Sequence, residues 1–295
     1  MPSERYLDVT AIELPSTKNA DEAANRPRER VPHTFCRLLP YPMRYLFAKR
    51  HLPVLAHFAS SNVMLAFDYD GTLAPITNEP SRARLRGRTR RLLIAVARRY
   101  PCVVISGRRR DDVMKRLKGI PVGHVFGNHG LEPWGQDTAY AEQVREWVDH
   151  LERRLLSFSG LIVEDKTYSV AIHYRCVRQK RLVVQAINNA VLGLRGSRTM
   201  GGKQAVNLVA RDAPNKGMAL ERARRLLACD CAVYVGDEET DEDAFRGPAP
   251  ERLLSIRIGA ARTSGAHYHL KSQGEIDSLL RMLVRLRPRE SAGFD

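Results

Sequence analysis

The stretch that decides the fold is Val63-Met64-Leu65-Ala66-Phe67, which leads directly into Asp68-Tyr69-Asp70-Gly71-Thr72. An unbroken apolar run of this length predicts a strand that is buried on both faces of a parallel sheet. Similar apolar runs recur at 102–105, 232–235 and 253–258. We therefore expect a parallel sheet that contains all of these strands.

Helical spacing of apolar residues fills the intervals between the strands, at 89–99, 111–117 and 216–227. Strands that alternate with helices are typical of a doubly wound, Rossmann-like α/β fold. Ligands of such sheets bind beyond the carboxyl ends of the strands. We therefore expect Asp68, Ser106 and Asp237, which follow three of the strands, to meet at one crevice.

The stretch 131–209 breaks this alternation. Its patterns predict helices at 139–156 and 179–194 and strands at 161–164, 168–174 and 204–209. We interpret it as an inserted α/β cap domain that excludes water from the crevice. The core domain then comprises 36–130 and 210–295, with short helices over 36–60, and a flexible leader occupies 1–35.

The composition is that of a globular protein that stays out of membranes. The 295 residues allow two domains, and no apolar run approaches the ~20 residues of a spanning helix. The first residues lack the pattern of a secretory signal, so we expect a cytoplasmic protein. Five cysteines without zinc-site spacing favour reduced thiols.

The net charge of +15 raises the possibility of nucleic-acid binding. The basic residues are spread over several segments, however, and no helix-turn-helix, zinc-finger or aromatic-stacking motif accompanies them. We expect no nucleic-acid partner. A basic surface equally attracts anionic sugar phosphates.

Two carboxylates two residues apart, Asp68 and Asp70, stand at the end of a predicted strand. Like charges so close together repel, and a divalent cation is the usual reason for the arrangement. Mg²⁺ prefers oxygen ligands, so we predict a magnesium site made by Asp68, Asp70 and Asp237. Asp241, four residues after Asp237, is predicted either to support these ligands from behind or to be a secondary ligand.

The same residues suit phosphoryl transfer. Asp68 can attack a phosphorus atom, while Asp70 can protonate the leaving oxygen and later activate water. Phosphoryl transfer also needs donors around the phosphate. The residues predicted to bind it are Gly71, Thr72, Ser106, Gly107 and Lys216, the last at the start of a helix.

The order of these residues along the chain resembles the four motifs of the haloacid dehalogenase superfamily. Longer strings resemble the trehalose-6-phosphate phosphatases of that superfamily. They are Phe67-Asp68-Tyr69-Asp70-Gly71-Thr72-Leu73-Ala74-Pro75-Ile76, Ile105-Ser106-Gly107-Arg108, Gly127-Asn128-His129-Gly130-Leu131-Glu132, Asn215-Lys216-Gly217 and Gly236-Asp237-Glu238-Glu239-Thr240-Asp241-Glu242-Asp243-Ala244-Phe245.

The resemblance implies a magnesium-dependent phosphatase that releases trehalose from trehalose 6-phosphate. It also implies which residues contact the sugars: Arg108, Asn128, His129 and Glu132 near the hinge, and Glu164, Lys166, Arg175, Lys203 and Asn207 in the cap. One position departs from the family, because Asn207 stands where its members usually have a Glu. A neutral amide binds a sugar hydroxyl less strongly than a carboxylate does.

Three alternatives stay open at this point. The first is a phosphatase of another phosphorylated sugar or glycoside, which Asn207 favours. The second is a phosphosugar mutase of the same superfamily, which returns the phosphoryl group to a sugar. The third is a basic binding protein that has lost its activity; the intact set of Asp68, Asp70, Lys216 and Asp237 argues against it. A trehalose-6-phosphate synthase, if the pathway is present, is expected to be a separate chain.

Overall fold

The structure is a computed structural model that describes residues 43–77, 79–134, 138–202, 204–247 and 250–288. All of them belong to one compact unit, 38–295. The predicted leader 1–35, Cys36 and Lys203 lie outside the described residues. Among the helices that are described, none has the length and apolar character needed to cross a membrane. Cys102, Cys176, Cys229 and Cys231 are free thiols, as expected.

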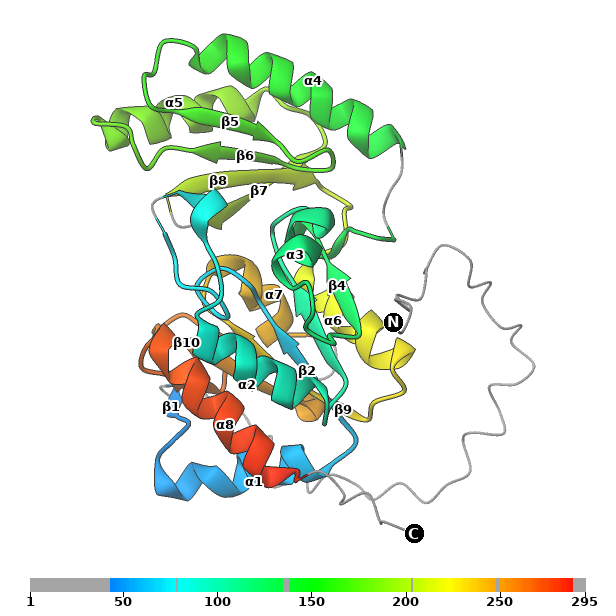
Figure 1. Cartoon of the computed structure of the whole chain (residues 1–295). Coiled ribbons are helices and arrows are strands. Elements are labelled where there is room, and N and C mark those ends of the chain that lie inside the picture. The colour runs from blue at the N-terminus through cyan, green and yellow to red at the C-terminus, as the bar shows by residue number, and fades with distance from the viewer. Residues whose placement is uncertain (1–42, 78, 135–137, 203, 248–249, 289–295) are drawn as a thin grey trace, which may run out of the picture. The chain divides into compact units, whose positions relative to one another are not determined.

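A seven-stranded parallel sheet is the centre of the fold (Figure 1). Its strands stand in the order β1-β11-β10-β9-β2-β3-β4. Their bounds are Arg44–Tyr45 (β1), Val63–Phe67 (β2), Cys102–Ile105 (β3), His124–Phe126 (β4), Cys231–Gly236 (β9), Leu253–Ile258 (β10) and Tyr268–Leu270 (β11). Because β2 lies between β9 and β3, the residues that follow these three strands emerge side by side.

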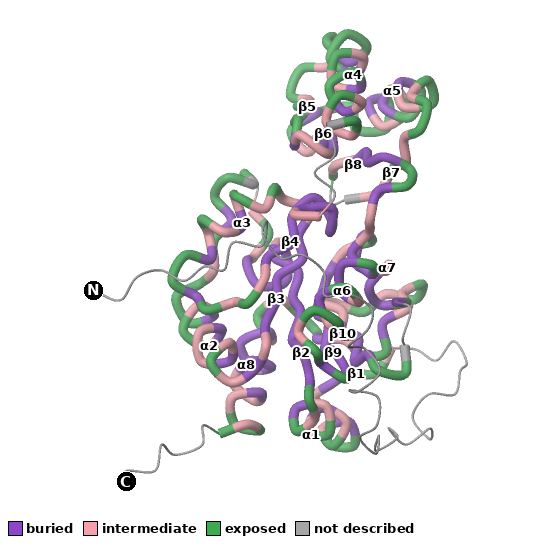
Figure 2. Tube along the Cα trace, turned by 90° about the vertical axis from the view of Figure 1, so that its right-hand side faces the viewer, coloured by how far each residue is buried: buried purple, intermediate pink, exposed green. Residues whose placement is uncertain are grey.

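Helices cover both faces of this sheet, and β2 shows why. Val63, Leu65 and Phe67 pack on one side, while Met64 and Ala66 pack on the other. The central strands are accordingly buried along their whole length (Figure 2). The first face is covered by α1 (Leu52–Ser60), α2 (Gly87–Ala97), α3 (Arg110–Arg116) and α8 (Ile276–Leu286), and the second by α6 (Lys216–Leu226) and α7 (Glu242–Phe245).

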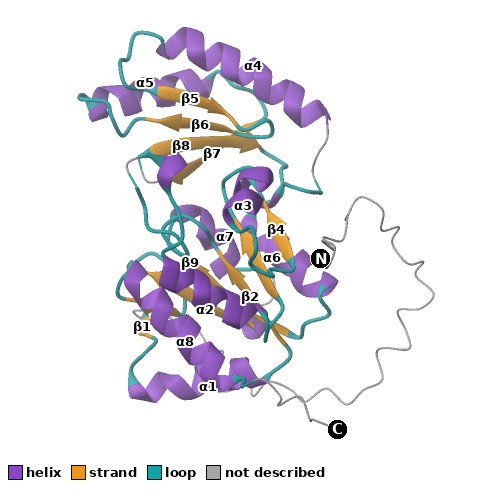
Figure 3. Ribbon diagram, in the orientation of Figure 1, coloured by secondary structure: helices purple, strands orange, loops and turns teal. Residues whose placement is uncertain are grey.

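A second, antiparallel sheet is formed within the inserted stretch, and we call it the cap sheet. Its strands stand in the order β5-β6-β8-β7, with bounds Ile162–Asp165 (β5), Val170–His173 (β6), Ser197–Gly202 (β7) and Ala205–Ala210 (β8). Two helices, α4 (Thr138–Leu155) and α5 (Lys180–Leu192), cover one of its faces (Figure 3). Val170, Ile172 and Leu208 point to these helices, so Ala171 and Asn207 point to the opposite face.

The predicted fold class, a doubly wound core with an inserted α/β cap, is confirmed. Each predicted buried strand lies within one residue of its observed bounds. No pattern in the sequence had predicted β1, β4, β7, β11 or α8. Short 3₁₀ turns complete the path at Lys49–His51, Pro80–Arg82, Asn128–Gly130 (η7), Glu239–Asp241 (η8), Pro250–Arg252 and Gln273–Glu275.

Candidate active site

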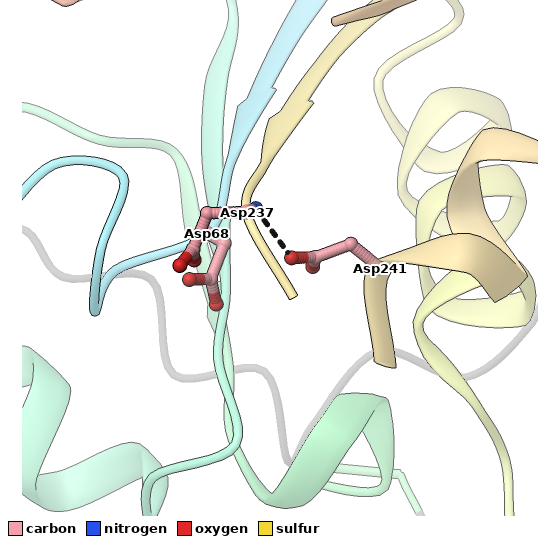
Figure 4. A group of neighbouring side chains, drawn as sticks. All are labelled: Asp68, Asp237 and Asp241. Atoms are coloured by element: carbon pink, nitrogen blue, oxygen red, sulfur yellow. Dashed lines mark hydrogen bonds between the residues drawn. The ribbon is translucent and has the colours of Figure 1, made fainter. Parts of the chain in front are cut away.

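Three buried carboxylates meet at the carboxyl ends of β2 and β9 (Figure 4). Asp68 follows β2, Asp237 follows β9, and Asp241 ends the short turn η8. One oxygen of each lies within 4.8 Å of the others. The parallel pairing of Phe67 with Val235 brings the two strand ends level, so the convergence expected of Asp68 and Asp237 is present.

The turn after β2 fits closely against Asp237. Gly71 has a φ of 83°, a backbone conformation that glycine adopts without strain. A Cβ atom at this position would run into the Asp237 carboxylate. The Thr72 hydroxyl lies 3.5 Å from Asp237 Oδ1 and is fully buried. The turn therefore depends on the absence of a side chain at residue 71.

Lys216 neutralises part of this acidic cluster. It begins α6, whose first turn is capped by the Asn215 side chain. Its Nζ donates to Asp68 Oδ1 at 2.9 Å and to Asp241 Oδ1 at 2.7 Å. Burial alone would lower the pKa of Lys216, but the charges of Asp241 and Asp68 raise it well above its usual value. Lys216 is therefore a fixed cation between two carboxylates.

Both oxygens of Asp241 are already engaged. Oδ1 accepts from Lys216 and from the Tyr234 hydroxyl at 2.6 Å. Oδ2 accepts from the main-chain N–H groups of Asp237 and Glu238 at 2.8 and 2.9 Å. Burial raises the pKa of Asp241, but Lys216 and these hydrogen bonds lower it overall. The geometry suits a residue that orients its neighbours, which is one of the two roles expected for Asp241.

Asp68 differs from Asp241 in its hydrogen bonding and in the direction of its pKa shift. Among the described residues, its Oδ2 has no hydrogen-bond partner although it is buried. Burial raises the pKa of Asp68 well above its usual value, Lys216 opposes this, and Asp241 and Asp237 add to it. A buried carboxylate oxygen without a donor, beside further carboxylates, matches the oxygen chemistry of a Mg²⁺ ligand. The residues present therefore fit a divalent cation.

Asp70 directs its carboxylate to Arg108, and it is not among the three clustered side chains. Arg108 Nε donates to Asp70 Oδ2 at 2.5 Å, and Nη2 donates to Oδ1 at 2.8 Å. Arg108 Nη1 donates to Asp112 Oδ2 at 2.9 Å, and Asp112 also accepts from Arg116. Burial would lower the pKa of Arg108, but Asp70 and Asp112 raise it.

The loop after β3 presents Ser106 and Gly107. The Ser106 hydroxyl accepts from the main-chain N–H of Arg108 at 3.2 Å. The imidazole of His129 packs so closely against Gly107 that a Cβ atom there would overlap the ring. The Gly107 carbonyl accepts from Lys166 Nζ at 3.1 Å. This loop therefore touches both the turn η7 and the segment that follows β5.

Three of the predicted hinge residues, Asn128, His129 and Glu132, are buried, and they differ in their hydrogen bonds. Asn128 donates to the Lys166 carbonyl at 3.1 Å and accepts from the Ser169 hydroxyl at 2.8 Å. Glu132 accepts from the main-chain N–H of Arg110 at 2.7 Å. Neither ring nitrogen of His129 has a partner among the described residues, and burial, then Lys216 and Lys166, lower its pKa well below its usual value.

The predicted cap residues divide into two groups. Glu164 and Asn207 share the helix-free face of the cap sheet, because both align with Ala171 across neighbouring strands. Lys166 is buried and donates to the core loop, and burial lowers its pKa. Arg175 Nη1 donates to the Thr77 carbonyl at 2.7 Å. Glu164 and Asn207 thus belong to one surface, while Lys166 and Arg175 connect the cap to the core.

Residues 66–273 match the family model of trehalose-phosphatase. The chain belongs to the trehalose-phosphatase family. It is therefore a phosphoric monoester hydrolase. It is 27% identical to a probable trehalose-phosphate phosphatase 3 of Oryza sativa, over 83% of this chain and 78% of that one. It is 26% identical to trehalose 6-phosphate phosphatase RA3 of Zea mays, over 79% and 72%.

Solved structures support the fold of this trehalose-phosphatase family member. The C-terminal domain of trehalose-6-phosphate phosphatase from C. albicans aligns with a TM-score of 0.67 and 20% identity. The alignment covers 83% of this chain and 98% of that one. A trehalose-6-phosphate phosphatase related protein aligns with a TM-score of 0.61 and 24% identity, over 76% and 97%.

Sequence reasoning missed three side chains of this trehalose-phosphatase site. Tyr234 donates to Asp241, Asp112 holds Arg108, and His173 Nε2 lies 2.7 Å from Glu164 Oε2. Partial burial would raise the pKa of Glu164, but His173 and Lys166 lower it. The alternation of β6 was an available signal, since it places His173 on the same face as Ala171. Nothing in the sequence indicated the Tyr234 contact.

Proposed function

We propose that the chain hydrolyses trehalose 6-phosphate to trehalose and phosphate, through an aspartyl-phosphate on Asp68 and with one Mg²⁺ ion. The observation that supports this most directly is the buried contact of Asp68 with Lys216, beside Asp237 and Asp241. A carboxylate held by one cation, with a second oxygen unpaired among the described residues, suits an attacking nucleophile.

In the first half-reaction an oxygen of Asp68 bonds to phosphorus while the bond from phosphorus to the sugar oxygen breaks. Lys216 Nζ, the hydroxyls of Thr72 and Ser106 and the main chain at Gly71 and Gly107 bind the phosphate oxygens. Asp70 gives a proton to the departing sugar oxygen. The negative charge that develops on the phosphate oxygens and on the sugar oxygen is therefore stabilised by a nearby donor in each case.

In the second half-reaction Asp70 accepts a proton from water as the water oxygen bonds to phosphorus. The bond between phosphorus and Asp68 breaks, which restores the Asp68 carboxylate and gives inorganic phosphate. Asp241 keeps Lys216 and the main chain of Asp237 in place throughout. The side chains of Asp68, Asp70, Lys216 and Asp241 therefore serve both half-reactions.

Mg²⁺ would be held by the carboxylates of Asp68 and Asp237 and, since the Asp70 carboxylate contacts Arg108, by the main-chain carbonyl of Asp70. When bound, the ion neutralises the charge of the phosphate and of the surrounding carboxylates. The main-chain N–H of Asp237 donates to Asp241 Oδ2, which keeps Asp237 in a fixed position.

The names of the relatives and the cap sheet support the choice of substrate. The curated relatives from rice and maize are described as phosphatases of trehalose phosphate. Glu164 and Asn207 lie on one face and offer acceptors for the hydroxyls of the distal glucose. We place Lys203 in the same group of sugar contacts, although it lies outside the described residues. The hinge residues Asn128, His129 and Glu132 shape the loop around the proximal sugar.

A second candidate is a phosphatase of another phosphorylated sugar or glycoside. Asn207 favours it, because a buried neutral amide replaces the acid that the family resemblance leads us to expect. A mutase would share the first half-reaction and differ in the acceptor of the phosphoryl group. We place the enzyme in the cytoplasm, where a separate trehalose-6-phosphate synthase would supply its substrate.

The test is a panel of phosphorylated sugars and glycosides, with phosphate release measured at saturating Mg²⁺. Trehalose 6-phosphate is expected to give the highest kcat/KM, and free trehalose and phosphate are expected in equal amounts. Removal of metal by a chelator should abolish turnover and added Mg²⁺ should restore it, whereas excess calcium should inhibit. Full activity after verified metal removal, or a phosphorylated sugar as product, would refute the proposal.

A further inference from the structure

Asp70 and Arg108 form the most directional ion pair near the site. Two guanidinium nitrogens donate to the two oxygens of one carboxylate, at 2.5 and 2.8 Å. Such a parallel pair of bonds fixes the plane of the carboxylate as well as its position. The side chain of Arg108 is 13% exposed, and that of Asp70 is 36% exposed. The pair therefore lies between the buried site and solvent.

Arg108 is itself held from outside the site. Its remaining terminal nitrogen donates to Asp112 in the first turn of α3. Asp112 accepts two further bonds from Arg116 Nε, at 2.9 and 3.0 Å. Arg116 Nη1 donates to the Ala83 carbonyl. A chain of charged groups thus anchors the Arg108 fork to α3 and to the segment before α2.

We infer that Arg108 is a positioning residue that holds the Asp70 carboxylate in the orientation that accepts a proton from water in the second half-reaction. This rests on the proposed function, in which Asp70 is the acid and base. A fork that donates to both oxygens matches a carboxylate, because each oxygen then acts as an acceptor. A carboxylic acid that donates to the sugar oxygen has to turn its hydroxyl away from the fork. The ion pair between Asp70 and Arg108 is therefore intact in the second half-reaction and is broken in the first.

Of the two residues in this ion pair, only Asp70 takes part in the chemistry of the step. The water oxygen bonds to phosphorus, the water proton passes to Asp70, and the acyl phosphate bond to Asp68 breaks. Arg108 exchanges no atom or electron and acts only on the orientation of the base. The family resemblance predicts that Arg108 contacts the sugar, so the two roles need an experiment that separates them.

The experiment compares Arg108→Gln with Arg109→Gln on trehalose 6-phosphate and on p-nitrophenyl phosphate, which has no sugar. Arg109 is the adjacent, half-exposed arginine that pairs with Asp111, and it serves as the matched control. Since kcat/KM reports the steps up to formation of the aspartyl-phosphate, a defect in the second half-reaction leaves it nearly unchanged. We expect Arg108→Gln to lower kcat roughly ten- to a hundredfold and KM in parallel, on both substrates.

Acid quenching in the steady state gives a second readout. The aspartyl-phosphate should accumulate in Arg108→Gln and stay low in the wild type and in Arg109→Gln. Arg108→Lys keeps the charge and loses the fork, so it should show the same pattern more weakly. Asp112→Asn, which loosens the anchor without touching Asp70, should follow with the smallest effect.

Two results separate the inference from its premise. A raised KM and a lowered kcat/KM on trehalose 6-phosphate, with p-nitrophenyl phosphate unaffected, would overturn the inference in favour of a sugar contact. Asp70→Asn is measured beside these variants. If Asp70→Asn leaves both half-reactions intact, the proposed function itself is wrong; if it blocks them and Arg108→Gln accumulates no aspartyl-phosphate, only the inference is wrong.

Discussion

The polar side chains of the core crevice and of the cap sheet differ in how deeply they are buried and in how many contacts restrain them. In the core, the side chains of Lys216 and Asp241 are both 0% exposed and are bonded to each other. On the helix-free face of the cap sheet, the side chain of Glu164 is 47% exposed and that of its neighbour His173 is 26% exposed. The buried charges of the core are held in place by one another, whereas the Glu164 carboxylate, which we propose as an acceptor for the distal sugar, is in contact with solvent.

Topology explains the difference. Asp68 and Asp237 follow central strands of a parallel sheet, whose neighbours on both sides fix where each strand ends. Glu164 belongs to β5, an edge strand of the cap sheet, so only one neighbouring strand restrains it. Changes in the crevice should therefore affect every substrate, and changes at Glu164 should affect only substrates that reach the cap.

The largest effect is expected from Asp68→Asn. An amide cannot form the acyl phosphate, so kcat should fall by about 10⁴-fold or more on every phosphate ester. The measurement is phosphate release from trehalose 6-phosphate and from p-nitrophenyl phosphate. Asp111→Asn, an exposed aspartate of α3, is the control and should leave kcat unchanged. Most of the wild-type activity in Asp68→Asn would exclude this nucleophile.

Lys216→Met should impair both stability and turnover. It leaves Asp68 and Asp241 buried without their cation, and breaking a buried ion pair in this way costs about 3–5 kcal/mol of unfolding free energy. Turnover should fall roughly a hundredfold or more on both substrates. Denaturant unfolding and phosphate release measure the two effects, with the exposed Lys115→Met as the control. Unchanged stability would show that the buried pair contributes nothing.

Gly71→Ala should separate backbone strain from displacement of Asp237. Gly71 and Gly119 share a positive φ, 83° and 78°, so alanine costs each about 1–2 kcal/mol of stability. A Cβ atom at 119 meets only the Arg90 guanidinium at 3.4 Å, whereas at 71 it meets the Asp237 carboxylate. Only Gly71→Ala should therefore lose activity, by roughly a hundredfold. Equal activity of both variants would contradict a role for the turn in placing Asp237.

The cap gives the smallest and most selective effects. Glu164→Gln should lower kcat/KM for trehalose 6-phosphate roughly tenfold and spare p-nitrophenyl phosphate. Lys166→Met should lower kcat/KM for both substrates, because Lys166 donates to the carbonyl of Gly107, which we propose to bind the phosphate. Asn207→Glu should raise kcat/KM for trehalose 6-phosphate up to about tenfold if the position binds the distal sugar. Equal losses on both substrates in Glu164→Gln would indicate a structural defect in the cap.

The core sheet was more predictable from the sequence than the cap sheet. Apolar runs predicted β2, β3 and β9, because a strand buried on both faces needs an unbroken apolar run, and the mostly apolar run 253–258 predicted β10. The aspartates after β2 and β9 then predicted the convergence of Asp68 and Asp237. Strand β7 was missed because Ser197–Gly202 ends in two glycines, which lack β propensity, at an edge of the cap sheet. Pairing of β7 with β8 supplies the missing stability.

Side-chain partners were less predictable than strand ends. The distance from Arg108 to Asp70 depends on how two separate loops fold back, and no spacing in the sequence encodes it. The pairing of His173 with Glu164 depends on the register of β5 and β6, which a one-residue shift would abolish. For this reason the residue types on the helix-free face of the cap sheet were predictable from the sequence, but their mutual contacts were not.

The family match begins at residue 66 and ends at residue 273, yet the folded core extends beyond both limits. Leu46 and Leu55 precede the matched region, and Leu279 follows it; all are fully buried in the same cluster. Arg287 ties the end of α8 to the carbonyl of Ala59 at 2.8 Å. The residues before and after the matched region thus pack against it and are bonded to each other. A fragment cut at the limits of the match would expose apolar surface and aggregate.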